Sequence, residues 1–443
     1  MDKCKDRRWV VERVKDVLIL LLTLSALWLG TRSQLLGPMR EYFQEETPQI
    51  NPITTQQEAL AEAVRPLRMI AALEGGTGIR RYAVQCDQAA ADELFQQVAS
   101  LLSETVSGAG AAEPVDRRRW EQALLTAPSV VFDFQGRLPI EVLVGWLTGD
   151  ATQLTGTVRR LVLAVEEETM VLYYRNQEDG GYYRCLSSAE HSENLRQVLS
   201  ELAENQASFA FESESYQMLD PDTLVQETIS DPVAYSAINP VADGRASLEE
   251  LMKELGFPVN GSSFYSAGSE HVARSGNNSV RLSDKGTLIY QAENTLNETL
   301  VAARGWTATS VFEQVEACRR MAAATLSVRC GDARLYLQSV QEVDQGLEVR
   351  FGYCLNGIPV QLEEGSAAWF LVQDGMVTQF EFHLRSYSSL GTTTALLPMR
   401  QAVAALEALG LEGEELQLMY SDSGSDLVTA GWTAVDHQPK EGG

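Results

Sequence analysis

The chain has 443 residues, 44% of them hydrophobic, and a formal net charge of −26. This length exceeds what one ordinary hydrophobic core supports, so the sequence predicts a globular chain of two or three domains. A body this acidic repels nucleic acid and anionic lipid headgroups. That excludes nucleic acid as a partner and favours a place outside a membrane over one on its surface.

An apolar run, VLILLLTLSALWLG at residues 17–30, follows a short tail with six basic and four acidic side chains. As a helix, the run spans about 21 Å, which is less than the hydrocarbon core of roughly 30 Å. Three interpretations are therefore open: a cleaved signal peptide, a buried core helix and an uncleaved membrane anchor.

The residues around this run favour the anchor. A signal-peptide cleavage site needs small residues, but Arg32 and bulky residues follow the run. A core helix of a globular domain would show an amphipathic pattern, and the run has none. We expect a transmembrane anchor over 17–36, with Arg32 reaching the outer interface and Trp28 as an interfacial aromatic. The protein then spans the cell membrane once, with residues 1–16 as a cytoplasmic basic tail and the body extracytoplasmic.

The first part of the body predicts a stalk and an α+β domain. Three prolines among polar residues indicate a stalk over 37–56. Over 57–213 we expect an N-terminal α+β domain, in which a strand at 82–86 precedes a helix opened by Asp87. Further strands are predicted at SVVFDF and along RRLVLAVEEETMVLYYRN, and further helices at PIEVLVGWLTG and SENLRQVLSELAEN.

The second part repeats the order of a helix followed by meandering strands. A proline-dotted stretch at 214–245 is predicted to be a linker, and a central helix-plus-hairpin module over 246–300 begins with a capping box formed by Ser247 and Glu250. A C-terminal helix-plus-meander domain is predicted over 301–443, with hairpin turns at Asn356-Gly357 and Asp374-Gly375. In its last meander strand, Thr378, Phe380, Phe382 and Leu384 alternate with polar residues.

These patterns predict an α+β fold. A single N-terminal transmembrane helix is followed by two or three extracytoplasmic modules of antiparallel sheet packed by helices, of the cystatin or PepSY type.

Candidate catalytic patterns are missing from the sequence. The four histidines lie in no metal-binding spacing, and His383 is expected on a solvated strand face between Glu381 and Arg385. The glycine-rich EGGTGIRR at 74–81 lacks the lysine and flanking elements of a phosphate loop, and SDSGSD at 421–426 lacks the length of a calcium loop. We therefore predict no catalytic residues, no metal, no cofactor and no enzymatic activity.

The six cysteines form no CxxC pair and are too few for a disulfide scaffold. We interpret them as buried small hydrophobic residues, with a Cys318–Cys330 or a Cys330–Cys354 bridge as the alternative.

Several stretches, taken in order, resemble one family. They are EAVRPLRMI with RRYAVQCD, RWEQALLTAPSVVFDFQGRLPIEVLVGWL, SSFYSAG with SVRLSDKGTLIYQ, and VRFGYCLNGIPV with AAWFLVQDGMVTQFEFHLRSY. Together with the anchor, they are similar to the YycH/YycI accessory regulators of the YycFG (WalKR) two-component system of Gram-positive bacteria, closest to the clostridial YycH-like branch.

This resemblance implies a non-enzymatic regulator that modulates a sensor histidine kinase and thereby cell-wall homeostasis. The kinase is the implied partner, and a paralogous accessory protein is a further candidate, as a heterodimer. In the membrane, the small residues Thr23, Ser25, Ala26 and Gly30 are candidates for helix–helix contact, and an orientation toward lipid is the alternative. An alternative function is an anchored extracytoplasmic binding or peptidase-inhibitor module.

Overall fold

The computed structural model describes residues 62–75, 78–189, 192–241, 244–275, 278–292 and 310–436, all within one compact unit, Ala59–Gly443. The predicted tail, anchor and stalk lie outside the described residues, as do the candidate contact residues Thr23, Ser25, Ala26 and Gly30. In the part of the chain that is described, no helix combines the length and apolar character needed to cross a bilayer.

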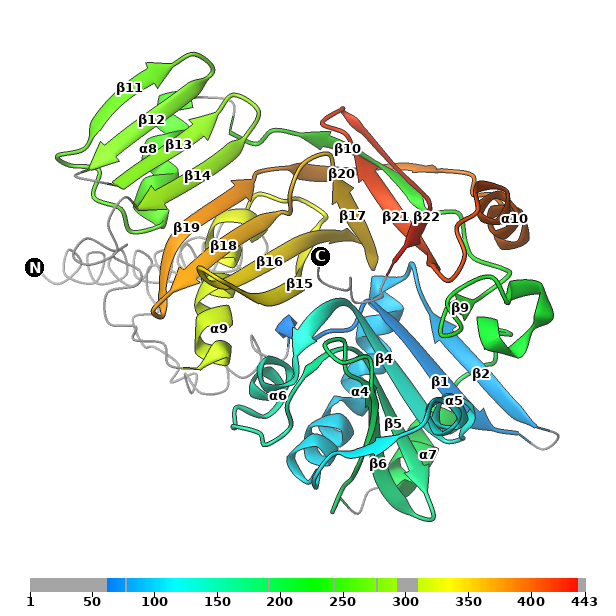
Figure 1. The fold of residues 1–443 in the computed structure, drawn as a ribbon. Helices are drawn as coiled ribbons and strands as arrows, with labels where there is room; N and C mark the ends of the chain where they lie inside the picture. The colour runs from blue at the N-terminus through cyan, green and yellow to red at the C-terminus, as the bar shows by residue number, and fades with distance from the viewer. Residues whose placement is uncertain are drawn as a thin grey trace, which may run out of the picture. The chain divides into compact units, whose positions relative to one another are not determined.

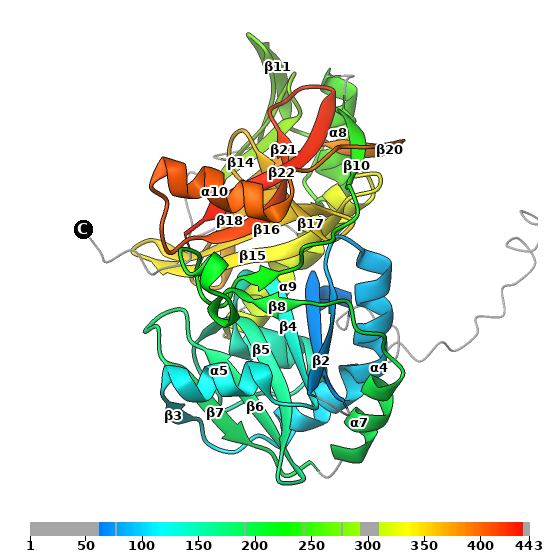
Figure 2. The ribbon, with the colours of Figure 1, turned by 90° about the vertical axis from the view of Figure 1, so that its right-hand side faces the viewer.

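The N-terminal lobe is an antiparallel sheet with helices on both faces (Figures 1 and 2). Its strands pair in the order β2-β1-β4-β5-β6-β7-β3. They are β1 (Arg68–Glu74), β2 (Ile79–Val84), β3 (Glu113–Val115), β4 (Ser129–Pro139), β5 (Thr157–Glu166), β6 (Thr169–Arg175) and β7 (Tyr182–Leu186). The helices are α4 (Gln88–Ser107), α5 (Arg117–Leu125), α6 (Ile140–Thr148) and α7 (Ser192–Ser200).

Alternation along the strands explains why this sheet is covered twice. Successive strand residues point to opposite faces, so an almost wholly apolar strand such as β5 must be buried on both. On one face, Leu161 and Leu163 share a core with α4. On the other, Val162 packs in a separate core with Trp120 and Leu124 of α5.

The C-terminal lobe contains a second large antiparallel sheet, ordered β11-β12-β13-β14-β19-β18-β16-β15. From β16, pairing continues through β17, β21, β22 and β10 to β20. Helix α8 (Gly244–Glu254) packs on β12 and β13, and α9 (Val311–Ala322) packs on β16, β18 and β19. Helix α10 (Met399–Leu409) belongs to a third core that includes Leu416 of β21.

The bounds of these strands follow the chain order. They are β10 (Val233–Ile238), β11 (Ser263–Ala267), β12 (Glu270–Ser275), β13 (Asn278–Ser283), β14 (Thr287–Ala292), β15 (Arg334–Val343), β16 (Gly346–Leu355), β17 (Ile358–Leu362), β18 (Ala368–Gln373), β19 (Met376–His383), β20 (Ser386–Thr393), β21 (Glu415–Asp422) and β22 (Leu427–Val435). Two short strands, β8 (Ser208–Phe209) and β9 (Leu224–Val225), pair with each other between the lobes in the sequence.

The mixed α+β class and the antiparallel sheets are confirmed. Asn356 and Asp374 both adopt positive φ at the predicted hairpin turns, and the predicted apolar face of β19 is buried. The predicted capping box of Ser247 and Glu250 is wrong, because α8 already begins at Gly244 and Ser247 lies inside it. The stretch 214–245, predicted as a linker, contains β10, which pairs with β20 and β22. The division into domains stays a prediction.

The cysteines pack as small apolar residues. The five that the structure describes are free, and all but Cys86 are buried. Neither the Cys318–Cys330 nor the Cys330–Cys354 bridge is therefore formed.

Candidate functional site

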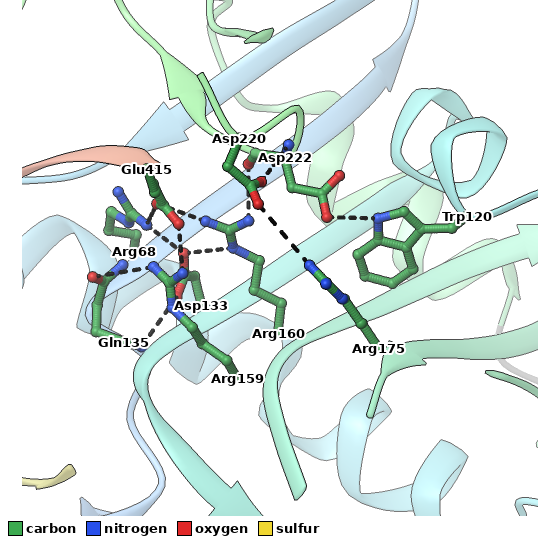
Figure 3. Close-up of polar contacts among 10 residues, drawn as sticks. All are labelled: Arg68, Trp120, Asp133, Gln135, Arg159, Arg160, Arg175, Asp220, Asp222 and Glu415. Carbon is green, nitrogen blue, oxygen red and sulfur yellow. Dashed lines mark hydrogen bonds and ion pairs between the residues drawn. The ribbon is translucent and has the colours of Figure 1, made fainter. Parts of the chain in front are cut away.

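Five charged residues from distant parts of the chain meet where the two lobes join (Figure 3). We call them the buried charge cluster: Arg68 on β1, Asp133 on β4, Arg159 and Arg160 on β5, and Glu415 on β21. The carboxylate of Glu415 lies 347 residues from Arg68 along the chain. All five side chains are almost completely buried, so the charges must compensate one another.

The two carboxylates bridge the three guanidinium groups. Arg68 Nη2 donates to Asp133 Oδ2 and to Glu415 Oε1, both at 2.6 Å. Arg160 donates from Nε to Asp133 Oδ2 at 2.8 Å and from Nη2 to Glu415 Oε1 at 2.7 Å. Arg159 Nη1 donates to the other oxygen of Glu415. Glu415 thereby accepts charged hydrogen bonds from three strands of the N-terminal lobe's sheet region, which ties β21 to that lobe.

A bulge in β4 lets two adjacent arginines reach the same cluster. Neighbouring residues of a regular strand point to opposite faces, so Arg159 and Arg160 would ordinarily diverge. The register between β4 and β5 shifts between Asp133 and Leu138, and Gln135 there adopts φ +62°. Such bulges bend a strand and redirect its side chains. Gln135 Oε1 lies 3.4 Å from Arg159 Nη2, at the edge of the cluster.

The protonation states in the cluster are fixed at neutral pH. Burial alone would raise the pKa of Asp133, but Arg159, Arg68 and Arg160 together hold it below its usual value. Burial likewise opposes the charge of Arg160, yet the nearby Glu415 and Asp133 raise its pKa. Because these groups neither gain nor lose a proton near pH 7, the cluster is suited to holding strands together and unsuited to general acid–base catalysis.

A second ring of polar residues surrounds the cluster. Asp222 accepts a hydrogen bond from Trp120 Nε1 at 3.1 Å, and its backbone carbonyl accepts one from Arg160 Nη1 at 2.8 Å. Burial raises the pKa of Asp222 above its usual value. The cavity beside these residues measures only about 20 Å³, which holds a water molecule and no larger ligand.

Other contacts join the lobes near the cluster. The side chain of Asn356, in the β16–β17 turn, accepts from the backbone N–H of Gln88 at the start of α4 and donates to the carbonyl of Cys86 at 2.7 Å. Trp146 on α6 donates to Glu316 on α9 at 3.0 Å. Ser339 of β15 pairs in parallel with Arg137 of β4. The lobes are therefore connected by backbone, side-chain and ionic contacts together.

The residues singled out in the sequence lie apart from this cluster. His383 forms an ion pair with Glu381 at 3.0 Å, and its side chain is only 16% exposed, so its strand face is less solvated than predicted. In SDSGSD, Asp422 is buried and bound by Arg385 and Tyr387. Within the described ranges, no group of three or more His, Cys, Asp or Glu side chains could hold a metal ion.

Sequence reasoning missed the buried charge cluster. The available signal was the pair Arg159-Arg160 within TVRRLVLAV, an otherwise apolar strand, which places two charges where burial is expected.

The direction of the pKa shift of Asp133 predicts how stability depends on pH. A carboxyl group whose pKa is lowered by folding contributes stability that is present above its unfolded pKa, about 3.9, and is lost as the pH falls through the folded value. Asp133→Asn should therefore be much less stable than the wild type at pH 7, and the gap should narrow below about pH 4. Urea unfolding from pH 7 to pH 2 measures it. A gap that stays constant over this range would contradict the assignment.

Comparisons with known proteins address the fold. No protein-family model matches the sequence, and no curated protein matches it. Among solved structures, the crystal structure of YycH from Bacillus subtilis is similar, with a TM-score of 0.50 and 12% sequence identity, over 85% of this chain and 94% of that chain. The resemblance to YycH expected from the sequence is thus confirmed at the level of the fold: this chain has a YycH-like fold.

Proposed function

We propose that this chain is a membrane-anchored, non-enzymatic regulator that modulates a sensor histidine kinase of a two-component system controlling cell-wall homeostasis. The observation that carries the proposal is the YycH-like fold, which extends over 85% of the chain and so includes both lobes. The ordered sequence stretches that resemble the YycH/YycI regulators support the same family from separate data.

The buried charge cluster supports a binding role over a catalytic one. Its guanidinium and carboxylate groups are engaged with one another, and the adjacent cavity of about 20 Å³ has no room for a substrate. Such a cluster gives the body a fixed arrangement of its two lobes, which a partner can recognise as one surface.

The proposed topology places the regulator beside its kinase. Residues 1–16 form the cytoplasmic tail, 17–36 cross the membrane, and the acidic body lies outside the cell. A two-state kinase is biased only by a partner that binds its two states with different affinity. Contacts through the anchor and the body would supply that difference. A paralogous accessory protein is the further partner proposed.

The anchor contact can be tested by replacing its small residues. Thr23, Ser25 and Gly30 changed together to Leu should reduce the kinase recovered with the chain several-fold, because bulky side chains prevent close helix packing. Co-purification from membranes with the tagged chain measures the recovery. Leu18, Leu22 and Leu29 changed together to Ile serve as the matched control. Equal recovery from both variants would remove the helix contact from the proposal.

A further inference from the structure

A cleft of about 520 Å³ opens between the two lobes, away from the buried charge cluster's own small cavity. It is lined by residues that precede β1, by α4 and α6 of the N-terminal lobe, and by the end of α9, β15 and β16 of the C-terminal lobe. We call it the inter-lobe cleft. Its volume lies within the range of about 300–1,000 Å³ typical of small-molecule sites.

The lining of the inter-lobe cleft includes a continuous apolar component. Leu67 and Trp146 contribute from the N-terminal lobe, and Leu335, Leu337 and Phe351 contribute from the C-terminal lobe. Trp146 is fully buried and held by its hydrogen bond to Glu316. A rigid aromatic and aliphatic wall of this kind favours an apolar group of a ligand.

Cationic groups stand beside this wall although the chain as a whole is strongly acidic. Arg65 Nη1 and Arg334 Nη1 both contact the same oxygen of Asp92, at 3.0 and 2.6 Å. One carboxylate therefore serves two guanidinium groups. Glu62 lies 3.3 Å from Arg65, but its side chain is 68% exposed, so solvent weakens that pair.

Arg334 has capacity for a further anion. Its side chain is 54% exposed, and its only ion pair among the described residues is made through Nη1 to Asp92, which leaves the other N–H donors of the guanidinium facing the cleft or solvent. By contrast, Arg319 is held by Glu316 through both Nε and Nη2. The excess positive charge is thus located at Arg65 and Arg334.

Gln88 adds an unsatisfied acceptor at the same place. Its Nε2 donates to Asp92 Oδ1 at 2.7 Å, whereas its Oε1 is buried with no hydrogen-bond partner among the described residues. The side chain is only 6% exposed and contributes to the lining of the cleft. An unpaired buried acceptor is costly, and a hydroxyl donor would relieve the cost.

We propose that the inter-lobe cleft binds a small amphipathic anion, a carboxylate or phosphate that carries a short apolar body. The anionic head pairs with Arg65 and Arg334, a bidentate geometry that guanidinium groups favour, and the apolar body lies against Trp146 and Phe351. The proposal goes beyond the proposed function and does not depend on it, because it concerns only groups of the body.

The probe is decanoic acid carrying a photoreactive diazirine, used with the full chain in nanodiscs. After irradiation, mass spectrometry of the peptides locates the label. We expect labelling of peptides that contain residues 62–67 or 330–337. An excess of octanoate or octyl phosphate should reduce this labelling at least tenfold. Labelling that lies elsewhere on the body, or that octanoate does not reduce, would overturn the proposal.

Competitors and variants separate the two parts of the ligand. Acetate and inorganic phosphate test the head alone, and octanol tests the body alone; each should compete far more weakly than octanoate. Equal competition by either class would overturn the amphipathic assignment. Arg334→Ala should lower labelling of the cleft about tenfold and Arg334→Lys less, whereas Arg118→Ala, on the exposed face of α5, should leave it unchanged. If Arg334→Ala does not fold, the competition experiment on the wild type still decides the proposal.

Discussion

Replacing Glu415 with Gln is expected to lower the free energy of unfolding by about 3–5 kcal/mol. In the wild type, Glu415 accepts from Arg68, Arg159 and Arg160 inside the protein. The amide removes one negative charge and leaves three buried guanidinium groups with Asp133 as the bridging carboxylate. Uncompensated buried charge is among the costliest defects that a single substitution can create. Equilibrium urea unfolding, followed by tryptophan fluorescence, measures the change.

Glu412 provides the matched control for Glu415. It lies three residues earlier and is exposed, so Glu412→Gln should change the free energy of unfolding by no more than about 0.5 kcal/mol. If Glu415→Gln unfolds at the same urea concentration as Glu412→Gln, the cluster does not hold the lobes together.

Gly136→Ala is expected to destabilise the protein by about 1–3 kcal/mol, at the upper end of that range. A Cβ at position 136 would lie 2.0 Å from the carbonyl oxygen of Leu337, where β4 of one lobe meets β15 of the other. Backbone cannot rotate away as a flexible side chain can, so the two strands must separate. Thermal and urea unfolding of the purified variant measure the loss.

The control for this substitution is Gly431→Ala. A Cβ at Gly431, on β22, would meet no atom within 4 Å, so alanine should be neutral or slightly stabilising there. Equal stability of Gly136→Ala and the wild type would show that the joint between the lobes tolerates separation.

Local patterns carried the predictions that succeeded. The alternation of Thr378, Phe380 and Phe382 requires only that one strand face be buried, and the Asn356-Gly357 turn requires only a residue that tolerates positive φ. Asp87 caps α4 as expected, accepting from the backbone N–H of Ala90. Each of these features is decided within a few residues of the chain.

Long-range features could not be obtained in this way. The partner of Arg160 at Glu415 lies 255 residues away, and no spacing rule connects them. The bulge that redirects Arg159 depends on Gln135 taking positive φ, which its residue type does not favour. The capping prediction at Ser247 failed for a related reason: the motif was present, but the helix starts earlier, at Gly244.

The central claim is that this chain modulates a sensor histidine kinase. The most direct measurement is the initial rate of kinase autophosphorylation from ATP, with the kinase reconstituted in nanodiscs alone or together with the full chain. The account predicts a several-fold change in rate that saturates as the chain reaches equal stoichiometry with the kinase, and that is reduced by the Leu variant of Thr23, Ser25 and Gly30. An unchanged rate at saturating chain, with both proteins shown to share the same nanodisc, would contradict it.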